Sequence, residues 1–598
     1  MSKKPVWIAG IARGHNSGVC LLKDGEIVFS IEEERLSRVK YDGGPFASIL
    51  KIKEYTDKLD FMVFAHTTPL DTAGVIEYTG DVVYVGFARK LGLIDNKGYP
   101  QGHPQVIDLS NIHHKLHAAC AFYRSGWDSA AALVVDGAGT FFPTIVNGTE
   151  ITTWETESIY DCEYPANFKT LYKHQGTWVN IYPHVMKEMS ADWIGEPGET
   201  YEAVFSDRAG IVKVYEAVSK YCGFEEIEAG KTMGLFPYGQ PNNKIPALFN
   251  ETGDLSLSDR NVIIPTYPSG AGVNTLVSKY LDESIAYGQD LSQLQNRRDL
   301  AYACQVETQD QVVKLIRDTV KRTGKNRVVI SGGYGLNCVA NYHYLDALKN
   351  EGIEIYVEPI SNDAGTAMGA ALYFWHGQYQ DMTIRNYETL YLGPKHNYSI
   401  NDILQKSANE GVDIIDASYK DIVNLLTNKN IVTIFQGQSE NGPRALGNRS
   451  VLFDPRFEDG KDFVNTVKRR EYFRPFAGSI LEEHVHEWFD LRGMKNSPHM
   501  MYAVNCQPGV ADKIPSIIHV DGTCRIQTVT PIQNLHYYNL IKEFYNQTGV
   551  PILFNTSFNL GGEPLVETLE DAIRTLKNSD IEYLFLPEFN KLITVKNV

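Results

Sequence analysis

Two histidines four residues apart and two aspartates elsewhere in the chain form a candidate metal-binding set. His113 and His117 would share one face of a helix, because residues four apart are neighbours on a helical surface. Asp136 closes a predicted strand, and Asp363 lies beside a later glycine turn. Mixed imidazole and carboxylate ligation suits Fe(II), Mn(II) or Zn(II), and spacing does not choose among them. Because such histidine pairs also occur as ordinary surface or core residues, both interpretations stay open.

A second candidate site is cationic and lies in the C-terminal third of the chain. An Arg guanidinium offers a planar fork to phosphate oxygens, and a Lys ammonium offers a point charge. The basic residues that gather there are Arg444, Arg456, Lys468, Arg469, Arg470, Arg474 and Arg525. A solvated basic helix explains Arg469 and Arg470 well. It explains poorly Arg444 and Arg474, which adjoin prolines, and Arg525, which lies in a predicted strand, so we expect an anionic ligand.

Loops of glycine and small polar residues add donors for an anion. Gly332 and Gly333, followed by Asn337, come directly after a predicted strand. Backbone amides without a side chain can approach a phosphate closely, although a tight turn is the simpler explanation of one such cluster. A second loop, Ser361–Thr366, also contains a glycine turn, and the two loops together could bind a nucleotide. Ser557 lies in a polar run after another predicted strand.

Repeated strand patterns indicate how the chain positions these residues. A meander of strands over Val6–Ser30 has a second copy beginning at Ala131–Val135, which indicates an internal duplication. This pattern resembles the duplicated architecture of the actin, hexokinase and heat-shock ATPase superfamily. A linker at Leu392–Ser399 precedes a mixed α/β segment. We therefore predict an α/β fold with domains at 1–395 and 396–598.

The composition favours a soluble globular protein and disfavours nucleic acid and membranes as partners. The 598 residues include 56 Lys and Arg against 73 Asp and Glu, and the net charge of −17 disfavours nucleic acid or an anionic membrane as partner. There is no leader-like segment and no apolar run of about 18 residues, which predicts a cytoplasmic protein with no membrane partner. The eight cysteines form no CxxC pair, so we expect reduced thiols and a metal held by harder ligands.

Taken together, the motifs resemble those of the O-carbamoyltransferases of antibiotic and nodulation-factor biosynthesis, such as the tobramycin and cephalosporin types. The resemblance covers essentially the full length. It rests on Gly14–Ser17, Glu32–Arg35, His113–His117, Lys231–Leu235, Gly332 and Gly333 with Asn337, Gly442–Gly447, Arg474–Ala477 and Asn555–Asn559.

The resemblance implies a fold and a two-step reaction. The N-terminal domain would be similar to the tRNA threonylcarbamoyl-transfer enzymes, and the C-terminal domain to the threonylcarbamoyl-adenylate synthases. The C-terminal site would convert carbamoyl phosphate and ATP, with Mg²⁺, to a carbamoyl adenylate. The N-terminal site, with Fe(II) or a similar divalent metal, would pass the carbamoyl group to a hydroxyl. The acceptor stays open as a secondary metabolite, a sugar or a nucleoside, and a hydroxymethylated nucleotide is compatible.

The same resemblance assigns roles to single residues. Carbamoyl phosphate and nucleotide would bind to Arg444, Lys468, Arg474, Arg525 and Ser557; adenylate to Gly332, Gly333 and Asn337; and the metal to His113, His117, Asp136 and Asp363. His15 would be the general base for the acceptor hydroxyl, and Lys40 would stabilise charge on the transferring carbamoyl group. The plainer alternatives are a loop histidine and a surface lysine.

Two other functions remain as alternatives. A tRNA threonylcarbamoylation enzyme would need a basic path for tRNA, against which the acidic net charge argues. An actin-like or chaperone-like ATPase switch would have no use for a second phosphate site. The product of ATP turnover, AMP or ADP, separates the switch from the carbamoyltransferase.

Overall fold

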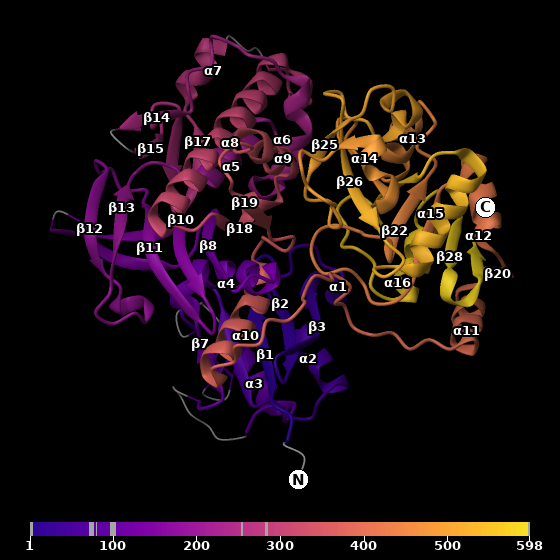
Figure 1. The fold of residues 1–598 in the computed structure, drawn as a ribbon, viewed down its shortest axis with the longest axis horizontal. Coiled ribbons are helices and arrows are strands. Elements are labelled where there is room, and N and C mark those ends of the chain that lie inside the picture. Colours follow the sequence, from indigo (N-terminus) through magenta and orange to yellow (C-terminus); the bar gives the residue numbers. More distant parts are fainter. Residues whose placement is uncertain are drawn as a thin grey trace. The chain divides into compact units, whose positions relative to one another are not determined.

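The computed structural model describes residues 4–70, 77–78, 81–95, 103–146, 148–252, 255–281 and 285–595. The chain forms two compact units (Figure 1). The first contains the residues up to Val28 together with Gly43–Glu388, and the second contains Phe29–Asp42 together with the chain from Thr389 onward. A short segment near the N-terminus therefore packs with the C-terminal part of the chain.

Two sheets form the framework of the first unit. A five-stranded sheet has the order β3-β2-β1-β4-β7, with β1 (Trp7–Ala12), β2 (Gly18–Lys23), β3 (Glu26–Glu32), β4 (Phe61–Ala65) and β7 (Val106–Asp108). An eight-stranded sheet has the order β12-β13-β11-β10-β8-β18-β19, with β9 paired to β10. Its strands are β8 (Ser129–Val135), β9 (Phe141–Val146), β10 (Thr149–Glu163), β11 (Asn167–Gly176), β12 (His184–Ser190), β13 (Thr200–Ser206), β18 (Arg327–Ser331) and β19 (Glu354–Val357).

The two sheets repeat one strand order. In the first, β1 is antiparallel to β2 and parallel to β4, and β4 is parallel to β7. In the second, β8 is antiparallel to β10 and parallel to β18, and β18 is parallel to β19. The order β3-β2-β1-β4-β7 thus corresponds to β11-β10-β8-β18-β19. This correspondence confirms the predicted α/β fold with a duplicated, actin/hexokinase-like first part.

Helix α10 (Ala364–Tyr379) lies unusually close to its neighbours. A Cβ placed on Gly369 would lie 1.9 Å from the carbonyl oxygen of Leu116 in α4 (His113–Ser125). A Cβ placed on Gly10 of β1 would lie 1.9 Å from the carbonyl oxygen of Ala367. The small residues at the start of α10 therefore let it pack backbone to backbone against a helix and a strand. The remaining helices of this unit are α2 (Phe46–Lys51), α3 (Val83–Lys90), α5 (Ile211–Tyr221), α6 (Ala229–Leu235), α7 (Thr275–Leu281), α8 (Gln295–Thr323) and α9 (Cys338–Ala347).

A ten-stranded mixed sheet forms the core of the second unit. Its order is β20-β29-β28-β21-β22-β27-β23-β26-β25-β24. The strands are β20 (Asp413–Asp416), β21 (Val432–Phe435), β22 (Arg449–Phe453), β23 (Ala477–Leu481), β24 (Phe489–Asp490), β25 (Ala503–Cys506), β26 (Thr523–Val529), β27 (Ile552–Ser557), β28 (Tyr583–Leu586) and β29 (Lys591–Thr594). The helices are α1 (Glu33–Ser37), α11 (Ile400–Glu410), α12 (Tyr419–Thr427), α13 (Gly460–Val467), α14 (Val485–Trp488), α15 (Leu535–Thr548) and α16 (Leu569–Lys577). In the described part of the chain, no helix combines the length and apolar character needed to cross a bilayer.

The close contact between α10 and α4 can be tested with two glycine substitutions on α10, one at the contact and one away from it. We expect Gly369→Ala to lower the free energy of unfolding by about 1–3 kcal/mol, because the new methyl group would overlap the backbone of α4. Gly377→Ala on the same helix places its Cβ 3.5 Å from the Cβ of Ala166, an ordinary contact. It should raise the stability by about 0.5–1 kcal/mol. Calorimetric unfolding of both variants checks this, and equal midpoints would contradict the packing argument.

Candidate active sites

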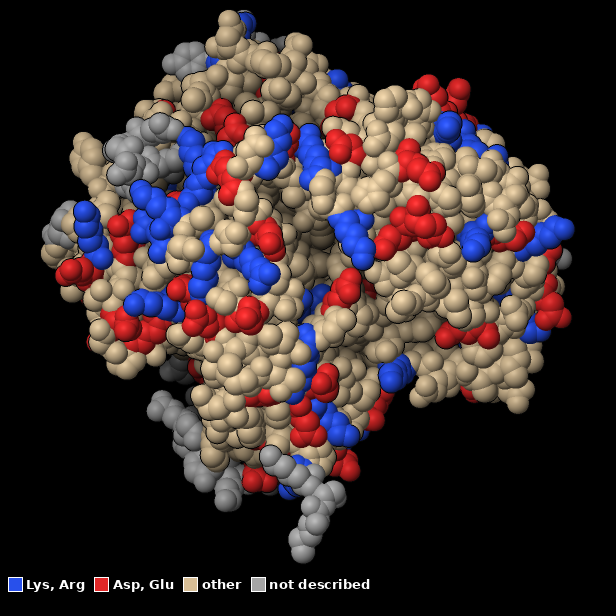
Figure 2. Space-filling view, viewed as in Figure 1, with Lys and Arg blue, Asp and Glu red and all other residues tan. Residues whose placement is uncertain are grey.

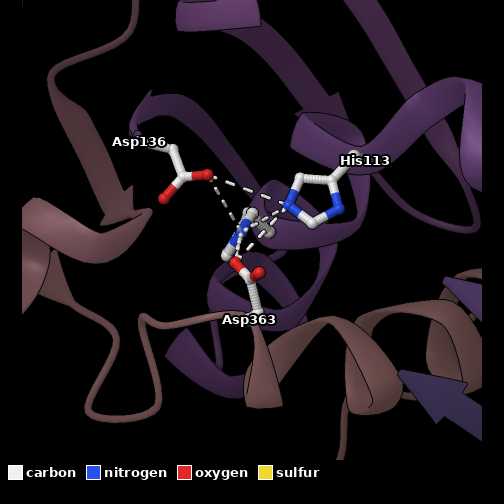
Figure 3. A group of neighbouring side chains, drawn as sticks. His113, Asp136 and Asp363 are labelled. Carbon is white, nitrogen blue, oxygen red and sulfur yellow. Dashed lines mark hydrogen bonds and ion pairs between the residues drawn. The ribbon is translucent and has the colours of Figure 1, made fainter. Parts of the chain in front are cut away.

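Three elements bring the predicted metal ligands of the first unit together. His113 begins α4 and His117 lies one turn later, so both imidazoles project from the start of this helix. Asp136 directly follows β8, and Asp363 directly precedes α10. Because α10 packs against α4, Asp363 is carried to the two histidines. Figure 3 shows the side chains of His113, Asp136 and Asp363 pointing toward one another.

The four ligand atoms converge on a small space. The Nε2 atoms of His113 and His117 are 3.2 Å apart. The Oδ1 atom of Asp363 lies 3.6 Å from the first Nε2 and 3.5 Å from the second. The Oδ2 atom of Asp136 lies 3.8 and 3.9 Å from the same two atoms, and all four ligand atoms lie within 4.8 Å of one another. One nitrogen or oxygen from each residue therefore faces a common centre, as in a metal site.

The electrostatics of this group favour a cation. Burial opposes a charge on His113, but hydrogen bonds to Asp136 and Asp363 outweigh it and raise the pKa of His113 to about 10. Burial would raise the pKa of both carboxyls, yet the neighbouring histidines hold both pKa values below the ordinary range. A buried and a partly buried carboxylate thus favour positive charge, which a divalent ion would supply at the point where both Nε2 atoms converge. The donor set fits Fe(II), Mn(II) or Zn(II).

Other histidines lie beside this group, among them His114, whose Nε2 is 3.9 Å from Oδ2 of Asp136. His15 is in the loop between β1 and β2, its side chain is 52% exposed, and its Nδ1 is 3.9 Å from Oδ2 of Asp363. His66 follows β4, and a Cβ on Gly14 would lie 3.7 Å from its Nε2. Burial, with the charges of Arg13 and His113, lowers the pKa of His66 to about 4. His66 is not among the site residues predicted from the sequence, although its position at the end of a strand is a signal for one.

The predicted glycine loop at Gly332 and Gly333 lies beside the four candidate metal ligands, which we call the metal-ligand group. Gly332 has a φ of +89°, and a Cβ there would lie 2.3 Å from the carbonyl oxygen of Val135. The amide of Gly333 donates a 2.9 Å hydrogen bond to Oδ1 of Asp136. The loop therefore orients one ligand carboxylate. Asn337 acts differently, because its side chain caps α9 through the Ala340 amide and donates to Gln305.

Lys468 is at the centre of the candidate anion site in the second unit. It follows α13, is 1% exposed, and donates to the carbonyl oxygens of Ser557 and Asn559. The hydroxyl of Ser557 donates to Oδ1 of Asn559 at 2.6 Å. Burial, together with the like charges of Arg470 and Arg474, lowers the pKa of Lys468 well below the ordinary lysine value. The structure thus places Lys468 against the backbone of Ser557.

Arg470 corrects one interpretation of the sequence. The solvated basic helix that seemed to explain Arg469 and Arg470 does not exist, because α13 ends at Val467 and Arg469 adopts a φ of +54°. Arg469 is exposed, but Arg470 turns inward and its Nη1 lies 3.4 Å from the hydroxyl oxygen of Thr556. Burial and the charges of Arg474, Arg525 and Arg444 lower the pKa of Arg470. Arg470 therefore forms one group with Arg444, Lys468, Arg474 and Arg525, which we call the cation cluster.

The predicted arginines lie near Arg470, since the charges of Arg474, Arg525 and Arg444 all act on its pKa. Arg525 lies in β26 opposite Ala477 of β23, and Arg474 is 3.5 Å from Glu471. Arg456 is not part of the cluster, because it pairs with Asp454 at 2.6 Å. Basic and acidic side chains are interspersed on the molecular face in Figure 2. Against that mixed surface, partly buried arginines gathered around a buried lysine indicate a site for an anion with several oxygens.

Lys40 lies in the second unit, not in the unit that carries His15. Its Nζ forms a 2.7 Å ion pair with Oε1 of Glu34, whose Oε2 also accepts from the Tyr41 amide. Lys40 is therefore held by an acid of its own segment.

Comparison with known proteins places this geometry in context. The family models described as "Carbamoyltransferase N-terminus" and "Carbamoyltransferase C-terminus" match residues 103–372 and 423–591. An uncharacterised protein, sll1178, from Synechocystis is 30% identical over 96% of this chain and 94% of its own length. Nodulation protein NolO of Bradyrhizobium diazoefficiens is 30% identical over 80% of this chain and 78% of its own. A phosphate- and nucleotide-bound HypF crystal structure has a TM-score of 0.35 at 14% identity, covering 63% of this chain and 56% of that one.

Substitution of one ligand should remove the metal. We expect His117→Ala to weaken binding of Fe(II), Mn(II) or Zn(II) by more than about 100-fold, because loss of a ligand costs more than loss of a residue that supports one. His343→Ala is the control, since His343 pairs with Asp310, at 3.0 Å, and is not one of the four predicted ligands. Metal content after dialysis and titration with each ion provides the measurement. Equal metal retention in the two variants would argue against the assignment.

The lowered pKa of Lys468 predicts a pH dependence. Sulfate affinity should fall with rising pH at a lower pH than for an ordinary lysine, because deprotonation removes a cation while sulfate keeps its charge. Arg470→Met removes a neighbouring positive charge, which raises the pKa of Lys468 and moves this decline to higher pH. Arg469→Met should leave it in place, since Arg469 is exposed and donates to Asn578. Calorimetric titration across pH checks this, and identical midpoints would contradict the cluster.

Proposed function

The chain belongs to the carbamoyltransferase family and is a carbamoyltransferase, and we propose that it uses ATP and carbamoyl phosphate to carbamoylate a hydroxyl group. Two sites divide the reaction. The second unit forms a carbamoyl adenylate, and the first unit transfers the carbamoyl group. The acceptor class is a small hydroxylated molecule: a secondary metabolite, a sugar or a nucleoside.

The cation cluster around Lys468 is the observation that carries the proposal. Its arginines and lysine suit the phosphate of carbamoyl phosphate and the phosphates of ATP together, because both substrates are polyanions. Water would cleave carbamoyl phosphate to carbamate and phosphate. The carbamate oxygen would then attack the α-phosphorus of ATP, and pyrophosphate would leave with the electron pair of the broken P–O bond. Arg444, Arg474 and Arg525 would stabilise the charge that develops.

The first unit supplies the groups for the transfer step. His15 would accept the proton of the acceptor hydroxyl as its oxygen attacks the carbamoyl carbon, and AMP would leave. A divalent ion held by His113, His117, Asp136 and Asp363 would act as a Lewis acid toward the oxygens of the adenylate. Gly332 would offer its backbone amide to the adenylate phosphate, while the Gly333 amide keeps Asp136 in place. Lys40, the other predicted catalytic residue, belongs to the second unit and pairs with Glu34.

Product analysis without acceptor tests this proposal. Full-length protein is incubated with carbamoyl phosphate, ATP, Mg²⁺ and Fe(II), and AMP, pyrophosphate and phosphate are quantified. We expect AMP and pyrophosphate to form only when carbamoyl phosphate is present. Arg474→Ala should slow pyrophosphate release by about 100-fold or more, because a charged donor to the transferring group is lost.

The matched control is Arg469→Ala, which removes the same charge from an exposed neighbouring position. It should retain nearly the full rate. Formation of ADP in place of AMP, or turnover that does not depend on carbamoyl phosphate, would favour the ATPase switch over carbamoyl adenylation.

A further inference from the structure

The segment Phe29–Asp42 is far in sequence from the anion site but packs in the same unit. The backbone amide of Ser30 donates to the carbonyl oxygen of Leu392 at 2.7 Å, and the hydroxyl of Ser30 accepts from the Asn441 side chain at 2.7 Å. The segment therefore reaches the loop that leads into Gly442 and Arg444. This loop carries one of the arginines of the cation cluster.

Arg35 fixes this first loop through its backbone. Its side chain is buried at 4% exposure, and its Nη2 donates to the carbonyl oxygen of Gly442 at 2.7 Å. Its Nη1 donates to the carbonyl oxygen of Glu440 at 3.3 Å. Gly442 has a φ of +95°, a conformation that favours glycine, so the loop follows one particular path into Arg444. Two hydrogen bonds from one rigid guanidinium hold the residues on that path.

Arg38 fixes a second loop of the same site. It donates to the carbonyl oxygens of Pro564 at 2.9 Å and Leu565 at 2.5 Å. The next residue, Val566, donates its amide to the carbonyl oxygen of Phe558, between Ser557 and Asn559. These two residues are the ones that contact Lys468. Arg38 thus supports the polar run that holds the buried lysine.

We propose that Arg35 and Arg38 are positioning residues of the anion site, so that the segment Phe29–Asp42 completes the carbamoyl-adenylate-forming unit. Both side chains donate to backbone carbonyls of the loops that carry Arg444 and Ser557. In this proposal the two arginines set the spacing of the anion-binding groups and do not themselves bind the anion. This inference rests on the proposed function of the second unit.

The test is kinetic and uses the full-length protein. Arg35→Met should raise the KM for carbamoyl phosphate in pyrophosphate release by about tenfold or more, because a loop freed from a charged donor no longer presents Arg444 in a fixed position. The kcat should change less. Arg35→Lys, which keeps the charge with fewer donors in a fixed geometry, should give an intermediate KM.

The control is Arg297→Met in the first unit. Arg297 is also buried and donates to a backbone carbonyl, that of Tyr221. Its loss should destabilise the protein without changing the KM for carbamoyl phosphate. If Arg35→Met and Arg297→Met raise this KM equally, Arg35 is merely structural and the inference fails.

Amide hydrogen exchange gives a readout that does not depend on turnover. Arg35→Met should accelerate exchange over residues 442–448, and Arg38→Met over residues 557–566, each in its own loop. Unchanged exchange in both variants would overturn the inference. If Arg474→Ala leaves pyrophosphate release intact, the proposed function fails instead, while the loop exchange still decides whether Arg35 and Arg38 hold these segments.

Discussion

Backbone contact between α10 and both β1 and α4 determines where the functional groups of the first unit lie. The carbonyl oxygens of Leu116 and Ala367 occupy the space that side chains on Gly369 and Gly10 would need. With larger residues the helix would move outward and carry Asp363 away from His113. The metal-ligand group therefore depends on residues that bind nothing themselves. The parallel pairing of β8 with β18 has a similar effect, since it places Gly332 against Val135 and Gly333 against Asp136.

The two candidate sites favour ligands of opposite charge. In the first unit, the carboxylates of Asp136 and Asp363 raise the pKa of His113, so a divalent ion bound there would take the place of a proton. In the second, Lys468 is buried and Arg470 is partly buried, and desolvation together with neighbouring cations lowers the pKa of both. Bringing like charges together in a poorly solvated place is costly unless an anion offsets it. Each unit is thus prepared for a ligand of the opposite charge, which is the arrangement that separate chemical steps would use.

Local sequence predicted those parts of the sites that depend on short spacing. The pair His113 and His117 and the strand-ending Asp136 follow from helix and strand geometry, and the repeated meander predicted the duplicated sheets. Arg470 was misassigned because a run of basic residues was interpreted as a solvated helix. The positive φ of Arg469 turns the backbone, so that the side chains of Arg469 and Arg470 point in different directions. The partners of Arg35 are more than 400 residues away, at Glu440 and Gly442, and no local pattern encodes a contact at that separation.

Because the chain passes between the units more than once, the second unit cannot be obtained whole by a single cut in the chain. The polypeptide passes from one unit to the other near Val28, again near Asp42 and a third time near Glu388. A fragment that begins at Thr389 would lack the donors of Arg35 and Arg38 and would leave carbonyl oxygens of two loops without their hydrogen bonds. Buried carbonyls that lose a charged donor cost roughly 1–3 kcal/mol each. A fragment cut at the linker seen in the sequence would therefore lack the segment Phe29–Asp42 of the second unit.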